Sequence, residues 1–121
     1  MKKIAIIDDE EHILSVLERY LKRKNLVEVE TFTNAKLATP KIKSGHYDLV
    51  LLDIMMPEVN GLDLLAEIKQ SNNSQKVIMM TAYSTEEKII KSDVTGACDY
   101  ITKPFISLRD VENKILDTLG I

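Results

Sequence analysis

Hydrophobic and polar positions follow two alternating patterns along this chain. Short apolar runs rich in β-branched residues are typical of strands. We predict five strands, at residues 3–7, 27–32, 48–52, 76–80 and 99–102. Longer segments between the strands repeat apolar residues at a spacing of three and four, which predicts helices. The repeat is clearest at Ile13, Leu14, Leu17, Tyr20 and Leu21, at Leu62, Leu65 and Ile68, and at Val111, Ile115, Leu116 and Leu119. We therefore expect each strand to be followed by a helix.

The strand patterns also indicate how the sheet is built. The first, third and fourth runs are almost continuously apolar, which is typical of parallel strands that helices cover on both faces. The second run alternates valine with glutamate, as a strand at the edge of a sheet does. The sequence therefore predicts an α/β fold with a doubly wound, five-stranded parallel sheet and helices on both faces.

Two of the expected helices have unfavourable sequences. The helix over 34–44 has Asn34 as its N-cap but contains Pro40, which removes one backbone donor and clashes with the carbonyl of Lys36. We expect this helix to kink or to restart near the proline. The helix over 85–95 ends in four residues of middling to poor helix propensity, so we expect it to be the least stable.

Composition places these elements in one domain, residues 1–121. The net charge of −3 argues against nucleic acid as a direct partner. A single cysteine, Cys98, fits a reducing compartment, and we expect it to be a small buried hydrophobic side chain. The first apolar run is too short for a signal peptide, and no apolar stretch has the length of a membrane span. We therefore expect a cytoplasmic protein that does not insert into membranes.

Reactive polar residues gather where the predicted strands end. They are Asp8 and Asp9 after the first strand, Asp53 after the third, Thr81 after the fourth, where Ala82 follows it, and Lys103 after the fifth. In doubly wound sheets, ligands bind beyond the carboxyl ends of the strands. Clustered carboxylates repel one another and need cations. Lys103 supplies one positive charge, and a hard divalent ion that prefers oxygen ligands supplies the rest; Mg²⁺ fits best, with Mn²⁺ as an alternative.

Each of these residues has an ordinary structural explanation when it is taken alone. Asp8 and Asp9 are suited to capping the first helix, and Thr81 is suited to capping the fourth. Lys103 fits a solvated charge, and Asp53 fits a loop turn. The combination at one edge of the sheet favours a functional site. The basic run at 22–24 lies at the end of the first predicted helix, where positive charges complement the helix dipole. We interpret it as a solvated helix end rather than a docking patch.

Four dispersed motifs resemble the receiver domain of two-component response regulators. They are Asp8-Asp9, the segment LLDIMMPEVNGLDLL around Asp53, the MTAY at Thr81, and the DYITKPF that contains Lys103. The resemblance extends over residues 3–119 and implies a flavodoxin-like sheet with strand order 2-1-3-4-5. It also implies a cis peptide bond between Lys103 and Pro104. One departure is Asn60, which stands where the family commonly has aspartate; both residue types cap helices.

The resemblance implies transfer of a phosphoryl group to Asp53 from a phosphohistidine on a sensor histidine kinase or a histidine phosphotransfer protein. The implied phosphoryl-binding residues are Thr81, Ala82 and Lys103. The implied ligands of the metal are Asp8, Asp9, Asp53 and the backbone carbonyl of Met55. Tyr100 looks like the aromatic residue that changes its rotamer when the side chain of Thr81 moves. Tyr83, two residues after Thr81, is a bulky side chain. It either hinders the water that would hydrolyse the acyl phosphate or is an exposed aromatic residue in a loop.

Three classes of function follow from these residues. The first is a single-domain phosphoacceptor that signals by protein binding through the fourth helix, the fifth strand and the fifth helix. We favour it because no output domain is expected within 121 residues. The second is a phosphatase with an aspartyl nucleophile, but that chemistry needs a second aspartate where Met55 stands. The third is an interaction domain that has lost phosphorylation, which would lack Asp53, Thr81 or Lys103.

Overall fold

The computed structural model describes all residues except 58, 82–95 and 106. Within this part of the chain, the predicted strands form one parallel sheet. They are β1 (Lys2–Ile7), β2 (Val27–Phe32), β3 (Leu49–Asp53), β6 (Val77–Thr81) and β7 (Asp99–Thr102). Their order across the sheet is β2-β1-β3-β6-β7, which is the predicted order 2-1-3-4-5 with the strands of this sheet counted alone. The expected edge position of β2 is confirmed.

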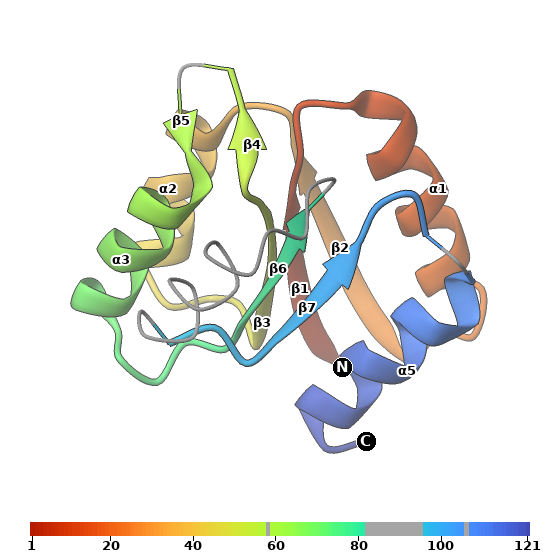
Figure 1. Ribbon diagram of the computed structural model, residues 1–121. Helices are drawn as coiled ribbons and strands as arrows, with labels where there is room; N and C mark the ends of the chain where they lie inside the picture. Colours follow the sequence, from red (N-terminus) through yellow and green to blue (C-terminus); the bar gives the residue numbers. More distant parts are fainter. Residues whose placement is uncertain (58, 82–95, 106) are drawn as a thin grey trace.

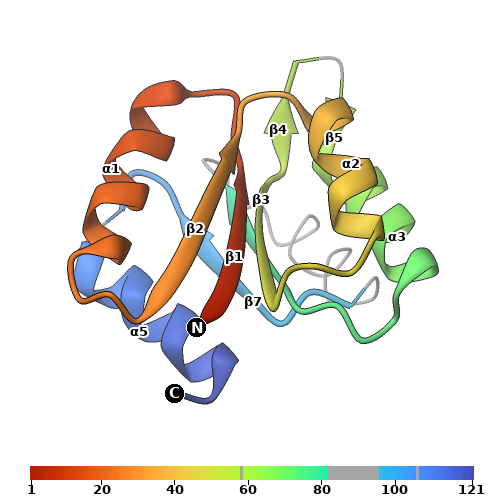
Figure 2. The same ribbon diagram turned by 180° about the vertical axis from the view of Figure 1, so that it is seen from behind.

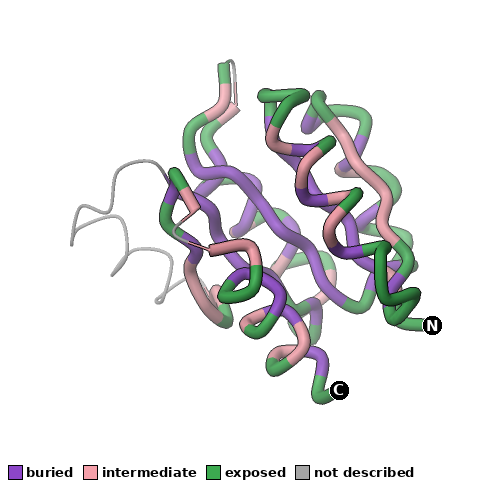
Figure 3. Tube along the Cα trace, turned by 90° about the vertical axis from the view of Figure 1, so that its right-hand side faces the viewer, coloured by how far each residue is buried: buried purple, intermediate pink, exposed green. Residues whose placement is uncertain are grey.

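Helices cover both faces of the sheet, as predicted (Figures 1 and 2). The described helices are α1 (Glu11–Lys22), α2 (Ala35–Lys43), α3 (Gly61–Ser71) and α5 (Leu108–Leu119). The helices pack on the sheet through two hydrophobic core clusters, one on each face. On one face α1 and α5 pack with Ile4, Ile6 and Leu51. On the other face α2 and α3 pack with Val50 and Leu52. Figure 3 shows how burial concentrates in the central strands and the inner sides of the helices. Within the described residues, the helices lack the length and the continuous apolar character that a membrane span requires.

Two strands lie one residue further along the chain than predicted. β3 begins at Leu49. The residue before it, Asp48, links the start of β3 to β1, because its carboxylate accepts a hydrogen bond from the Lys3 backbone N–H at 2.8 Å. β3 ends at Asp53, which pairs in register with Met80. The shift makes Asp53 the last residue of its strand, so its backbone is fixed by the sheet rather than by a loop.

The expected restart at Pro40 is wrong, because α2 is one helix from Ala35 to Lys43. The predicted cap is confirmed: the Asn34 side chain accepts a hydrogen bond from the Lys36 N–H at 2.8 Å. Pro40 cannot donate its own backbone bond. Buried side chains lie on both sides of it, at Ala38 and Ile42, and their packing favours a continuous helix.

A short hairpin was not predicted. It consists of β4 (Met55–Met56) and β5 (Val59–Asn60), which pair antiparallel and stand above the edge of the sheet in Figure 1. Two residues per strand are too few to leave a periodic pattern in the sequence. The hairpin leads directly into α3, whose N-cap Asn60 accepts a hydrogen bond from the Leu62 N–H at 2.8 Å.

Two further expectations need correction. Cys98 is exposed rather than buried; it directly precedes the edge strand β7. The basic run after α1 is more than a solvated end: Arg23 and Lys24 lie 3.2 and 3.3 Å from Glu112, a buried carboxylate on α5. Sequence spacing does not reveal which distant segments meet. The helix expected over 85–95, together with Tyr83, lies outside the described residues.

Candidate functional site

The carboxyl ends of three strands bring one lysine between two aspartates. Lys103 follows β7, and its Nζ atom lies 2.6 Å from Asp8 Oδ2 and 3.2 Å from Asp53 Oδ2. Asp8 follows β1 and has no exposed surface, Asp53 ends β3 and is 2% exposed, and Lys103 is 8% exposed. The structure thus brings together three of the residues that the sequence placed at strand ends.

Local hydrogen bonds hold the side chains of Asp8 and Asp53 and the backbone of Lys103 in place. Asp8 Oδ1 accepts a hydrogen bond from the Glu10 N–H at 2.9 Å, so Asp8 shapes the loop before α1. The N-cap of that helix is Glu10, which makes no side-chain capping bond. Asp53 Oδ1 accepts from the Met55 N–H at 3.2 Å. The Lys103 N–H donates to the carbonyl of Thr81 at 2.8 Å, and the Lys103–Pro104 bond is cis, as predicted.

Burial and charge shift the titration of both partners. Burial, and after it the negative charge of Asp8, raise the pKa of Asp53 to about 6, although the positive charge of Lys103 opposes the change. Burial lowers the pKa of Lys103, but the hydrogen bond to Asp8 and the charge of Asp53 outweigh this effect and leave that pKa raised. Lys103 therefore stays protonated, while Asp53 holds its proton more tightly than an exposed carboxyl does.

Two more carboxylates extend the site toward solvent. Asp8, Asp9 and Glu10 each offer a carboxylate oxygen, and these oxygens all lie within 4.8 Å of one another. Glu10 also lies 3.8 Å from Lys103 Nζ. Hard divalent cations bind such oxygen donors, and one ammonium does not balance four carboxylates, so the donor set fits a divalent ion. Glu10 was not predicted as a site residue. The feature of the sequence that could have indicated it is its position directly after Asp8-Asp9.

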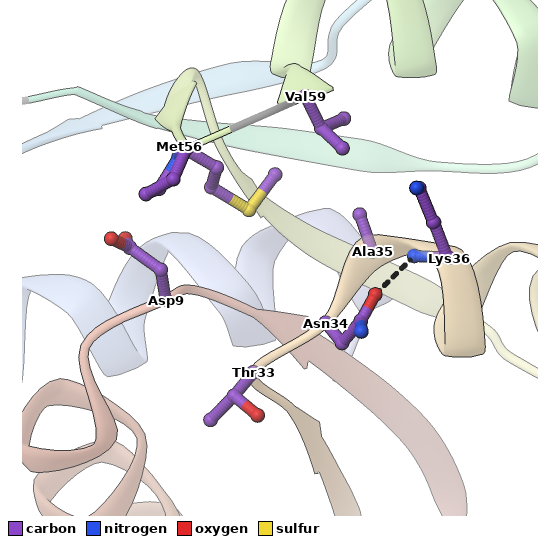
Figure 4. A pocket seen from close by; sticks show the side chains of 8 residues that line it. Asp9, Thr33, Asn34, Ala35, Lys36, Met56 and Val59 are labelled. Atoms are coloured by element: carbon purple, nitrogen blue, oxygen red, sulfur yellow. Dashed lines mark hydrogen bonds between the residues drawn. The ribbon is translucent and has the colours of Figure 1, made fainter.

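A hollow of about 280 Å³ opens beside Asp9. Figure 4 shows Asp9 on one side of it, with Asn34 and Lys36 on the other and Met56 of the hairpin above. Among the described residues of the predicted site, Asp9 is the one that lines this hollow. Asp9 is therefore reachable from solvent, in contrast to the buried Asp8.

The remaining predicted residues take different places. Thr81 is buried at the end of β6, where it pairs in register with Thr102 of β7. Tyr100 lies on β7, is partly buried and packs against the core cluster on the α2 and α3 side. Met55 opens β4 and is half-exposed. Ala82 lies outside the described residues, so its role stays a prediction.

Gly61 holds the backbone of Asp53 in place, a role that the sequence did not reveal. As the first residue of α3, its N–H donates to the carbonyl of Ile54 at 2.9 Å. A Cβ atom at this position would collide with the carbonyl oxygen of Asp53 and would lie 2.6 Å from the Cα of Ile54. Glycine thus permits a close approach between the start of α3 and the end of β3.

The chain is similar to known proteins along almost its whole length. It is 38% identical over 115 residues to the transcriptional regulatory protein SpaR of Bacillus subtilis, a match that covers 95% of this chain and 50% of SpaR. The chain thus spans about half the length of this curated relative.

Solved structures agree with this similarity. A CheY-like response regulator receiver domain protein from Methanospirillum hungatei JF-1 superposes with a TM-score of 0.90 at 32% identity, covering 99% of this chain and 94% of that one. The response regulator protein TrrA from Thermotoga maritima, crystallised in complex with Mg²⁺–BeF, gives a TM-score of 0.85 at 34% identity, covering 98% and 99%. The family model described as the response regulator receiver domain matches residues 4–116. On these grounds the chain belongs to the response regulator receiver domain family, whose members accept phosphoryl groups in two-component signalling.

Proposed function

We propose that Asp53 accepts a phosphoryl group from a phosphohistidine on a sensor histidine kinase or a histidine phosphotransfer protein. The observation that carries this proposal is the position of Lys103 Nζ, 2.6 Å from Asp8 and 3.2 Å from Asp53 at the carboxyl edge of the sheet. A receiver domain is a phosphoacceptor signalling domain and not a classical enzyme. Its own chemistry is to promote its phosphorylation and its slow dephosphorylation.

The transfer step needs positioning and charge neutralisation more than covalent help from the protein. A carboxylate oxygen of Asp53 attacks phosphorus, the bond between phosphorus and the histidine nitrogen breaks, and the imidazole leaves with the electron pair of that bond. Lys103 pairs with one phosphoryl oxygen, while the hydroxyl of Thr81 and the backbone of Ala82 hydrogen-bond to the others. Burial of Asp53 excludes water from the attacking oxygen.

Asp8, Asp9, Asp53 and the backbone carbonyl of Met55 are the residues that would hold Mg²⁺, or Mn²⁺ in its place. A bound divalent ion supplies positive charge that offsets the repulsion among the carboxylates and the incoming phosphoryl oxygens. The oxygen-only donor set supports this assignment. So does the similarity to TrrA, which was crystallised with Mg²⁺–BeF.

Residues 1–121 form one receiver unit in this proposal, which acts in the cytoplasm. It signals by phosphorylation-dependent binding to a protein partner through β7, α5 and the helix expected over 85–95. A hollow of about 160 Å³ between β7 and α5, lined in part by Ile101, Phe105 and Lys114, supports this face. The net charge of −3 argues against direct nucleic-acid binding. Thr81 and Tyr100 would link the site to this face.

Phosphorylation by a small donor tests the assignment of Asp53. We expect incubation with acetyl phosphate and Mg²⁺ to add one phosphoryl group, recorded as a change in intact mass, and omission of Mg²⁺ to slow the reaction. Asp53→Asn should abolish the adduct. Asp117→Asn removes an exposed carboxylate on α5 and is the matched control, which should label normally. A persistent adduct in Asp53→Asn would contradict the assignment.

Amide exchange tests the proposed face. Phosphodonor should change the exchange of backbone amides in β7 and α5 more than in α1. Tyr100→Ala should preserve labelling of Asp53 while reducing this change, because the aromatic ring would transmit the movement of Thr81. Equal changes in α1 and α5 would count against the face.

A further inference from the structure

We propose that Glu10 is a charge-selective positioning residue at the mouth of the site, which holds Lys103 and disfavours phosphodonors of higher negative charge. This inference rests on the proposed function and assigns a role to a residue outside the predicted set. Glu10 would act through Lys103 and through its own charge, without contacting phosphorus.

The position of Glu10 relative to Lys103 carries the inference. Lys103 Nζ has three carboxylate neighbours within the described residues: Asp8 at 2.6 Å, Asp53 at 3.2 Å and Glu10 at 3.8 Å. The side chains of Asp8 and Asp53 are almost completely buried, whereas that of Glu10 is 59% exposed. Glu10 is therefore the neighbour on the solvent side, where a donor must approach the ammonium group.

The backbone of Glu10 is fixed while its carboxylate is not used elsewhere in the helix. Its N–H donates to Asp8 Oδ1 at 2.9 Å, which ties the residue to the site. Although Glu10 is the N-cap of α1, its side chain makes no capping bond. The carboxylate can therefore serve the site at no cost to the helix, and a neutral side chain of the same shape should leave the fold unchanged.

The charge of Glu10 has two effects of opposite sign. Coulomb repulsion grows with the charge of the approaching group, so Glu10 slows a dianionic donor more than a monoanionic one. The same negative charge attracts a divalent cation to Asp8 and Asp9. Removal of the charge should therefore favour dianionic donors and weaken cation binding at the same time. A loss of structure would reduce both labelling and cation binding.

Two small donors of different charge provide the test. Near neutral pH acetyl phosphate is a dianion and loses acetate when its P–O bond breaks, whereas phosphoramidate carries about one negative charge and loses ammonia when its P–N bond breaks. Labelling rates of the wild type, Glu10→Gln and Glu11→Gln are compared by intact mass at saturating Mg²⁺. Glu11 is the matched control because it is the adjacent exposed glutamate, in the first turn of α1.

We expect Glu10→Gln to raise the ratio of the acetyl phosphate rate to the phosphoramidate rate by roughly two- to five-fold, the range of exposed charge pairs. It should weaken Mg²⁺ binding, measured by calorimetry, by a similar factor. Glu11→Gln should change both quantities less. An unchanged ratio, or equal ratios in the two variants, would overturn the role of Glu10 alone. A wild type that acquires no phosphoryl group on Asp53 would overturn this inference together with the proposed function.

Discussion

Lys103 Nζ lies 2.6 Å from Asp8 Oδ2, although the two residues come from opposite ends of the chain. Both side chains are buried, so water contributes little to stabilising either charge. The contact joins the last strand of the sheet, β7, to β1 across the carboxyl edge. The carboxylate of Asp53 lies 3.2 Å from the same ammonium group, whose positive charge therefore stabilises two buried carboxylates at once.

We predict that Lys103→Met destabilises the protein by about 3 kcal/mol at pH 7, because it leaves two buried carboxylates without a cation. Lys103 opposes the raised pKa of Asp53, so its removal should raise that folded-state pKa further above the unfolded value. The stability deficit should therefore be largest at neutral pH and shrink as the pH falls and Asp53 takes up a proton. Urea unfolding across pH measures this. Lys114→Met, which removes a partly exposed lysine paired with Asp99 at 3.5 Å, should have a small effect at every pH.

Asp9 provides a second prediction, about metal affinity. Asp9→Asn should weaken Mg²⁺ binding in a calorimetric titration, because it removes an accessible carboxylate from the oxygen cluster. The melting temperature without metal should stay the same or rise slightly, since one repulsion is relieved. Asp110→Asn, a control in the first turn of α5 and outside the carboxylate cluster, should leave Mg²⁺ affinity unchanged. Unaltered affinity in Asp9→Asn would show that the cation does not bind there.

Gly61 provides a third prediction, about the backbone of Asp53. Gly61→Ala should destabilise the fold by about 1–3 kcal/mol, because its Cβ would push against the backbone of Asp53 and Ile54. It should also slow phosphoryl labelling, since the acceptor carboxylate would be displaced. Gly45→Ala is the control: its Cβ would meet nothing within 4 Å, and its φ of +81° makes the substitution costly for a different reason. Gly45→Ala should lower stability without slowing labelling.

The sheet could be predicted because its information is local. Continuous apolar runs at β1, β3 and β6 require burial on both faces, and the alternation in β2 marks an edge. The strand ends then predict that Asp8, Asp53 and Lys103 lie together at one edge of the sheet. This works because parallel strands all present their carboxyl ends on the same side.

Several features that the sequence did not predict have a different cause, because they depend on which distant segments meet. Glu112 turned the basic end of α1 into an ion-pair cluster, and nothing near Arg23 in the sequence indicates that α5 lies there. The close approach at Gly61 and the contact between Glu10 and Lys103 likewise need the folded chain. At Pro40 local propensity predicts a kink or a restart; the restart is absent, because packing of Ala38 and Ile42 favours one continuous helix.

The last prediction concerns the edge strand β2, away from the phosphoryl site. The hydroxyl of Tyr47, a buried residue, donates a hydrogen bond to Glu30 on β2, and Lys41 on α2 pairs with the same carboxylate at 3.2 Å. The hydrogen bond from Tyr47 is the main cause that lowers the pKa of Glu30 below its ordinary value of 4.5. The same bond, after burial itself, raises the pKa of Tyr47 above its usual range.

Since the folded-state pKa of Glu30 is lowered, this carboxylate stabilises the fold above pH 4.5, and the stabilisation is lost as the pH falls through the folded-state value. Tyr47→Phe removes the donor and keeps the ring that packs edge-on against Phe32. We expect it to lower the free energy of unfolding by about 1 kcal/mol at pH 7. The free energies of unfolding of wild type and variant should converge as the solution is acidified below pH 4.5, because protonated Glu30 no longer gains from the bond.

Tyr20→Phe, on α1, is the matched control, and its free energy of unfolding should run parallel to that of the wild type below neutral pH. A constant difference between Tyr47→Phe and wild type from pH 7 to pH 3 would mean that the hydroxyl acts through packing and not through the charge of Glu30.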